Sequence, residues 1–66
     1  QLGLQEIENL ISSLPTGYRT IFNLYAIEGY SHAEIAQLLD ISEGTSKSQL
    51  SRARALLQNQ LAALQL

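Results

Sequence analysis

Apolar residues recur at intervals of three and four positions along most of this 66-residue chain. Such spacing puts them on one face of a helix, whereas a half-buried strand would show strict alternation. Turn-forming residues interrupt the pattern at about residues 14–17, 28–31 and 40–42. The pattern therefore predicts an all-α domain with four helices, at about residues 3–13, 16–27, 31–39 and 42–63.

The third and fourth helices carry clear start signals. Ser31 and Glu34 have the spacing of a capping box, and Ser42 has the side chain of an N-cap for the fourth helix. Asp40 lies in the turn between them and tolerates left-handed backbone, and Gly29 is expected to end the second helix in that conformation. A short capped helix, a tight turn and a longer helix form the helix-turn-helix pattern.

The fourth helix has distinct inner and outer faces when its residues are spaced at about 100° each. The inner face is apolar and carries Leu50, Ala53, Leu57, Leu61 and Leu64. The outer face carries Thr45, Ser48, Gln49 and Arg52 on one flank, and Gly44, Lys47, Ser51 and Arg54 on the other. Hydroxyl and amide groups suit base edges in the DNA major groove, and Lys and Arg suit phosphates. The alternative interpretation is an ordinary solvated face, although such a face usually mixes Glu with Lys.

The formal net charge of −2 argues at first against a nucleic-acid partner. The charge is divided, however: residues 1–43 hold six acids and one base, which sum to −5, and residues 44–66 hold three bases and no acid, which sum to +3. The positive part coincides with the outer face of the fourth helix. Three phosphate contacts predict a log–log salt slope of about −2.7, which is a weak electrostatic attraction. We therefore expect the domain to touch DNA as one part of a larger assembly.

Three motifs, in order along residues 10–58, resemble region 4 of the bacterial sigma-70 family of RNA polymerase sigma factors. The resemblance is strongest to the extracytoplasmic-function (ECF) group. The motifs are Leu14-Pro15-x-x-Tyr18-Arg19-x-Ile21-Phe22, then Glu28-Gly29-Tyr30-Ser31-His32-x-Glu34-Ile35-Ala36-x-x-Leu39, then Ile41-Ser42-Glu43-Gly44-Thr45-x-Lys47-Ser48-x-Leu50-x-Arg52-Ala53-Arg54. The Leu-Pro start and the Arg-Ala-Arg end separate the chain from LuxR-type response-regulator domains, which share the Ser-Glu-Gly-Thr cap.

The resemblance implies promoter recognition at the minus-35 element through helix 42–57, within the RNA polymerase holoenzyme in the cytoplasm. By motif, Ser42 and Thr45 would cap the helix and contact phosphate. The side chains implied to face DNA are Lys47, Ser48, Gln49 and Arg52, with Arg54 reaching the backbone. The implied partners are promoter DNA, the flap of the polymerase beta subunit and an anti-sigma protein. Residues 1–66 would then be one domain of a longer protein, without its region 2.

Three positions depart from the family pattern. Ser46 replaces a Val that packs under the helix start, and its hydroxyl is expected to bond a carbonyl one turn earlier. Gln49 replaces an Arg, and we hypothesise that it pairs with adenine, the alternative being a bond to water or phosphate. Asp40 replaces a Gly and is expected to cost a little stability at the turn.

Other functions find less support in the residues. An enzyme is the weakest interpretation, because the chain has no cysteine and His32 is its only histidine, predicted to be exposed at a helix start. For the same reason no metal site is expected, and no cofactor is expected either. No membrane partner is expected, since no apolar run approaches the roughly 20 residues of a membrane span. A LuxR-type domain and a protein-interaction domain that has lost DNA reading remain as alternatives.

Apolar residues also exceed what so small a core requires. They lie at both ends of the chain: Leu2, Leu4, Leu10, Leu56, Leu61, Leu64 and Leu66. Part of this excess is core, and part can form a groove for the polymerase flap or an anti-sigma helix. A homodimer through the tail is a further option, because Leu50, Leu57 and Leu64 repeat every seven residues.

Overall fold

The expected all-α, four-helix fold is confirmed in a computed structural model that describes residues 3–64. The helices are α1 (Leu4–Ser12), α2 (Thr16–Phe22), α3 (His32–Leu39) and α4 (Glu43–Leu64). Each begins and, apart from the second, ends within one residue of its predicted bounds. Gln1, Leu2, Gln65 and Leu66 lie outside the described residues, and with them two of the apolar positions noted above.

The second helix does not keep α-helical geometry to its predicted end at residue 27. Its last turn is a π-helix, η1 (Asn23–Ile27), in which the Glu28 N–H donates to the Asn23 carbonyl at 2.9 Å, five residues back. Gly29 then adopts a left-handed conformation with φ of 81°, as expected. The spacing of apolar residues over a single turn does not distinguish the α period from the wider π period, so this segment looked like plain helix in the sequence.

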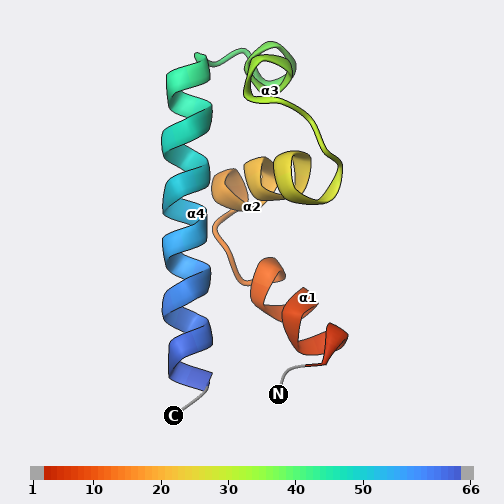
Figure 1. Ribbon diagram of the computed structural model, residues 1–66, viewed down its shortest axis with the longest axis vertical. Coiled ribbons are helices and arrows are strands. Elements are labelled where there is room, and N and C mark those ends of the chain that lie inside the picture. The colour runs from red at the N-terminus through yellow and green to blue at the C-terminus, as the bar shows by residue number, and fades with distance from the viewer. Residues whose placement is uncertain (1–2, 65–66) are drawn as a thin grey trace.

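Helix α4 runs the full length of the molecule, which measures 38 × 18 × 16 Å, and the other helices stack along one side of it (Figure 1). The α3 helix lies beside the start of α4, α2 beside its middle and α1 beside its end. The core centres on Ile21, Ile35 and Leu50, one each from α2, α3 and α4. Half-buried apolar residues pack around this centre: Phe22, Leu24, Tyr25, Leu39 and Ile41.

The start of α3 is held by local hydrogen bonds that the sequence predicted. The Glu34 N–H donates to Ser31 Oγ at 3.1 Å, and the Ser31 N–H donates to Glu34 Oε1 at 2.9 Å, which completes the capping box. The bond from the Ser31 backbone N–H to the Glu34 carboxylate, followed by the interaction of that carboxylate with the Ser31 side chain, lowers the pKa of Glu34 below its ordinary value. Asp40 is left-handed, with φ of 55°. The start of α3 and the backbone of the turn that leads into α4 are therefore both specified by residues close to them in the sequence.

Arg19, on α2, links the two ends of the connection between α1 and α2. Its Nη1 donates to the Ser12 carbonyl at 2.9 Å, at the end of α1 where carbonyls lack helical partners. Leu14 is buried in this connection, and Pro15 precedes the first residue of α2. Over residues 3–64, no helix combines the length and the hydrophobicity needed to cross a membrane.

Candidate nucleic-acid interface

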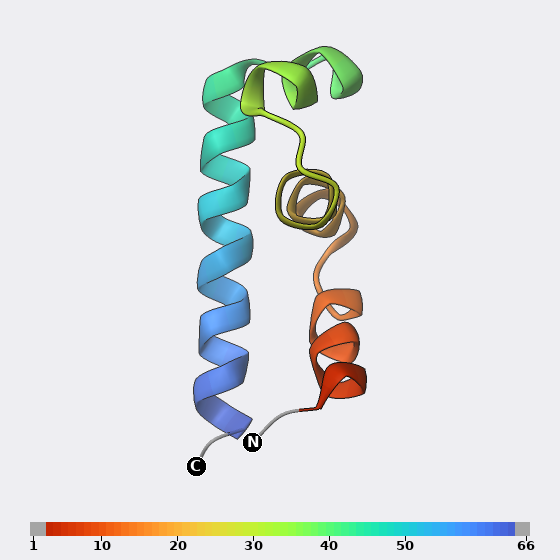
Figure 2. The same ribbon diagram turned by 45° about the vertical axis from the view of Figure 1, so that its right-hand side comes forward.

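The first half of α4 presents its polar side away from the other helices. Figure 2 shows α1, α2 and α3 on one side of α4, with the opposite side open. The inner face of this half is Ser46, Leu50 and Ala53, all buried. Six of the seven expected DNA-facing side chains are exposed: Ser42, Thr45, Lys47, Ser48, Arg52 and Arg54. Glu43, in the first turn, is the only carboxylate that α4 carries.

Ser42 caps α4 as expected. Its Oγ accepts from the Thr45 N–H at 3.0 Å and donates to Thr45 Oγ1 at 2.9 Å. This arrangement leaves the Thr45 hydroxyl proton to be donated outward, together with the unpaired backbone N–H groups of the helix start. Ser48 donates to the Thr45 carbonyl at 3.1 Å and keeps its lone pairs for a donor. The start of α4 thus offers N–H and O–H donors to an anion, the arrangement by which helix N-termini bind phosphates.

The seventh expected residue, Gln49, is half-buried. It lines a shallow depression beside α2 with Gly17, Thr20 and Thr45. Less of the Gln49 side chain is therefore exposed to a base than at the other six positions. This burial depends on the neighbouring helix and cannot be read from the wheel of α4 alone.

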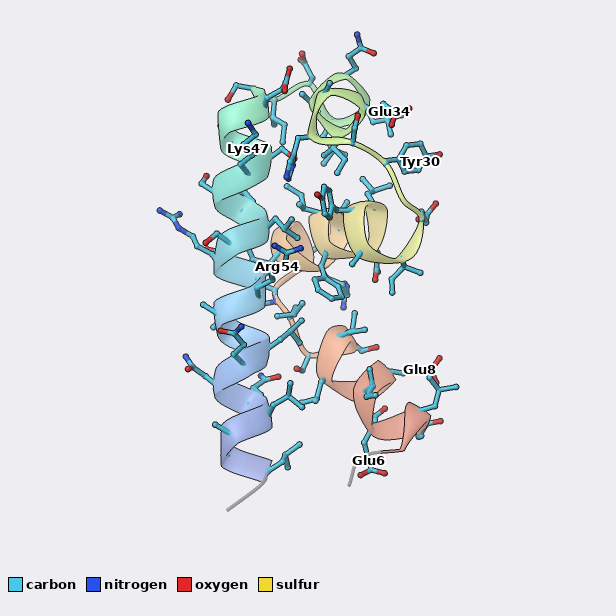
Figure 3. The ribbon with its side chains drawn as sticks, viewed as in Figure 1. Glu6, Glu8, Tyr30, Glu34, Lys47 and Arg54 are labelled. Atoms are coloured by element: carbon cyan, nitrogen blue, oxygen red, sulfur yellow. The ribbon has the colours of Figure 1, made fainter. Side chains whose placement is uncertain are left out.

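The opposite flank of α4 carries its own depression, toward α3. Figure 3 shows Lys47 and Arg54 on the same side of α4, about two turns apart. We call this feature the His32 depression, and it is lined by His32, Lys47, Leu50, Ser51, Arg54, Ala55 and Gln58. Two cations from α4 and an imidazole from α3 therefore share one concave surface.

Two expectations about this flank were wrong. Ser46 Oγ does not bond a carbonyl one turn earlier; it lies 2.8 Å from His32 Nδ1. His32 is half-buried rather than exposed, since its ring stacks on Tyr25 with centroids 4.5 Å apart. His32 was not predicted as a functional candidate, although polar Ser46 on the inner face of α4 indicated that a polar group lies opposite it on a neighbouring helix.

A second surface lies at the other end of the molecule, between α1 and the end of α4. A wholly apolar hollow there is lined by Ile7, Leu10, Ile11, Phe22, Leu57 and Leu61. Leu4, on α1, is 75% exposed, and Leu64, at the end of α4, is 58% exposed. The predicted apolar excess is therefore not all core: part of it stays on the surface around one cleft.

Comparison with known proteins agrees with this geometry. The chain matches the family described as Sigma-70, region 4, over residues 4–57. The ECF RNA polymerase sigma-E factor of Haemophilus influenzae is 35% identical over 54 residues, which cover 82% of this chain and 29% of that protein. The probable RNA polymerase sigma factor RfaY of Xanthomonas campestris pv. campestris is 40% identical over 52 residues, or 79% of this chain and 13% of that protein.

The chain thus spans less than a third of the length of either relative. No solved structure matches it at a comparable level of similarity. The family match covers most of the chain, including the whole helix-turn-helix and the first half of the long helix. By this match, the chain belongs to the Sigma-70, region 4 family.

Proposed function

We propose that this chain reads the minus-35 element of promoters through the first half of α4, as part of an RNA polymerase holoenzyme in the cytoplasm. The observation that carries the proposal is the outer face in the first half of α4: its side chains are polar and, apart from half-buried Gln49, exposed, and none from Gly44 onward is a carboxylate. A helix-turn-helix presents its second helix to the major groove in this way. The family membership supports the same function.

The residues would divide the work by chemistry. Thr45 and the free N–H groups at the start of α4 would bind a phosphate. Ser48 and Arg52, exposed on adjacent turns, would face the base edges. Lys47 and Arg54 would contact the backbone on the flank toward α3. Gln49 would contribute at most one contact from the edge of the face, because it is half-buried.

The apolar cleft between α1 and α4 would receive a protein partner. A cleft with exposed leucines nearby, at the far end of the molecule from the reading face, suits an apolar helix or loop. We assign it to the flap of the polymerase beta subunit, with an anti-sigma helix as a competitor for the same surface. This arrangement lets one small domain hold DNA and polymerase at once.

One alternative retains a specific observation in its favour. The observation is the half-burial of Gln49, which leaves one fewer exposed side chain to contact DNA. A domain that has kept the fold but lost DNA reading would still use the apolar cleft to bind a protein. The LuxR-type alternative is disfavoured by the family match.

Footprinting of the parent sigma factor with core polymerase separates these possibilities. The template is a promoter selected from a library with a randomised minus-35 region. We expect protection around minus-35 that is lost with Arg52→Ala and kept with Asn59→Ala, which alters an exposed side chain about two turns further along α4. Protection that is absent in the unaltered protein, or unchanged by Arg52→Ala, would favour the interaction domain.

A further inference from the structure

The His32 depression has the chemistry of an anion site. The polar residues in its lining are Lys47, Arg54, His32, Ser51 and Gln58, with no Asp or Glu among them. Lys and Arg side chains have only donors to offer, and the other three groups can donate. A tetrahedral oxyanion that accepts several hydrogen bonds is the ligand class that matches such a lining.

His32 is fixed in this depression from two directions. Its Nδ1 lies 2.8 Å from Oγ of Ser46, a residue with 0% exposure. Its ring stacks on Tyr25 at 4.5 Å between centroids, with 22° between the planes. The Arg54 guanidinium carbon in turn lies 5.7 Å from the centre of the Tyr25 ring. These contacts link Ser46, His32, Tyr25 and Arg54 in a chain that begins and ends on α4.

The bond to Ser46 determines which ring nitrogen carries a proton. Within residues 3–64, Nδ1 is the hydrogen-bonding partner of Ser46 Oγ, and every buried polar side-chain atom has a partner. A fully buried hydroxyl must donate its proton to avoid an unsatisfied donor, so Ser46 donates to Nδ1. The neutral ring then carries its proton on Nε2, and the cationic ring carries one there as well. Nε2–H is therefore a donor in either state.

We propose that the His32 depression binds one phosphate group of the DNA backbone, with His32 Nε2–H as a donor supplied by α3 beside the two cations of α4. The choice of DNA as the source of the phosphate rests on the function proposed above. The set of donor groups is a feature of the structure and does not depend on that function. Ser46 then acts as a positioning residue. Where the family pattern has an apolar Val, this chain has Ser46, whose hydroxyl fixes the His32 imidazole and thereby orients its Nε2–H toward the phosphate.

The test measures the affinity of the 66-residue chain for a short DNA duplex of arbitrary sequence at several salt concentrations. Phosphate contacts do not depend on base sequence, so the promoter need not be known. His32→Phe keeps an aromatic ring for Tyr25 and removes both nitrogens. We expect it to weaken binding about 3- to 10-fold with little change in salt slope, because one hydrogen bond is lost while the cations of Lys47 and Arg54 stay in place.

Three further variants calibrate that result. Lys47→Ala should make the log–log salt slope shallower by about 0.9, the amount for one phosphate contact. Ser46→Ala leaves the imidazole in place without its hydroxyl partner and should reproduce a large part of the His32→Phe loss. Asn59→Ala, outside the depression, should change neither affinity nor slope. Melting temperatures of all four variants separate loss of contact from loss of fold.

Nuclear magnetic resonance of the imidazole nitrogens gives the readout that a purely structural His32 would not move. We expect Nε2 to carry the proton in the free chain and its resonance to shift when duplex is added.

Several outcomes would overturn the proposal: an Nε2 resonance that duplex leaves unmoved, a proton on Nδ1 in the neutral ring, or no duplex binding at low salt. A shift produced by inorganic phosphate but not by duplex would assign the depression to a free anion and equally reject DNA. The footprinting experiment is independent, since sequence reading can fail while this phosphate contact persists, and the reverse also holds.

Discussion

The two halves of α4 differ in how the rest of the chain packs against them. Residues 43–53 bury Ser46 and Ala53 completely and leave Leu50 only 3% exposed, against α2 and α3. Residues 54–64 bury no side chain fully, although they carry more leucines than the first half, and Leu64 remains 58% exposed. One continuous helix therefore has a tightly packed half and a loosely covered half.

The difference matches two requirements that the proposed function places on the two halves of α4. A surface that reads DNA must hold its side chains at set distances, and close packing on the inner face supplies that rigidity. A surface that accepts an apolar partner must instead keep apolar area uncovered until the partner arrives. Short α1, which packs on α4 with no buried residue of its own, meets the second requirement.

Ile35→Ala tests the tightly packed half and should have the largest effect on stability. Ile35 is 0% exposed at the centre of the core, so we expect a loss of about 2–5 kcal/mol in the free energy of unfolding. Leu61→Ala, the matched change in the loosely covered half, should cost only about 1 kcal/mol. Urea unfolding followed by circular dichroism measures both. Equal losses would mean that the two halves are packed alike.

Ser42→Ala tests the start of α4 and should have an intermediate effect. The variant leaves the Thr45 N–H without the acceptor that Ser42 Oγ provides at 3.0 Å, and loss of such an N-cap costs about 1 kcal/mol. Ser48→Ala removes a hydroxyl of the same kind from the next turn, where it caps nothing, and serves as the control. Thermal unfolding should separate the two variants, and a Ser48→Ala effect as large as that of Ser42→Ala would contradict the capping role.

Glu34→Gln should have the smallest effect and tests the capping box at the start of α3. The pKa of Glu34 is lowered in the folded chain by its bonds to Ser31, so its contribution is present above the ordinary Glu range. That contribution is lost as the pH falls through this range and below it. Gln can keep the capping geometry without the charge. The unaltered chain should therefore be slightly more stable near neutral pH, and the difference should vanish on acidification.

Unfolding midpoints of the two chains across the acid range measure this difference. Glu8→Gln, on exposed α1, controls for the change in net charge. A stability difference that stays constant down to low pH would show that the Glu34 carboxylate does not contribute through its ionised form.

The parts of the fold that the sequence predicted are those decided within a few residues. The local signals are the capping box of Ser31 and Glu34, the left-handed residue Asp40 and the N-cap Ser42. Each acts on backbone groups no more than three positions away, so its role could be predicted without a tertiary structure. The π turn of η1 was missed because five residues do not define a period. The half-burial of Gln49 and the bond from Ser46 to His32 were missed because the partners come from other helices.

The sequence by itself determined the four helices, their caps and the division of charge, because hydrophobic periodicity and capping act locally along the chain. Only the tertiary structure decided which helix lies beside each flank of the outer face of α4. It thereby decided that Lys47 and Arg54 line one depression with His32, while Gln49 lines another beside α2. Contacts between residues 14 positions apart, such as Ser46 and His32, depend on how helices cross, and a helical wheel of one segment carries no information about its neighbours.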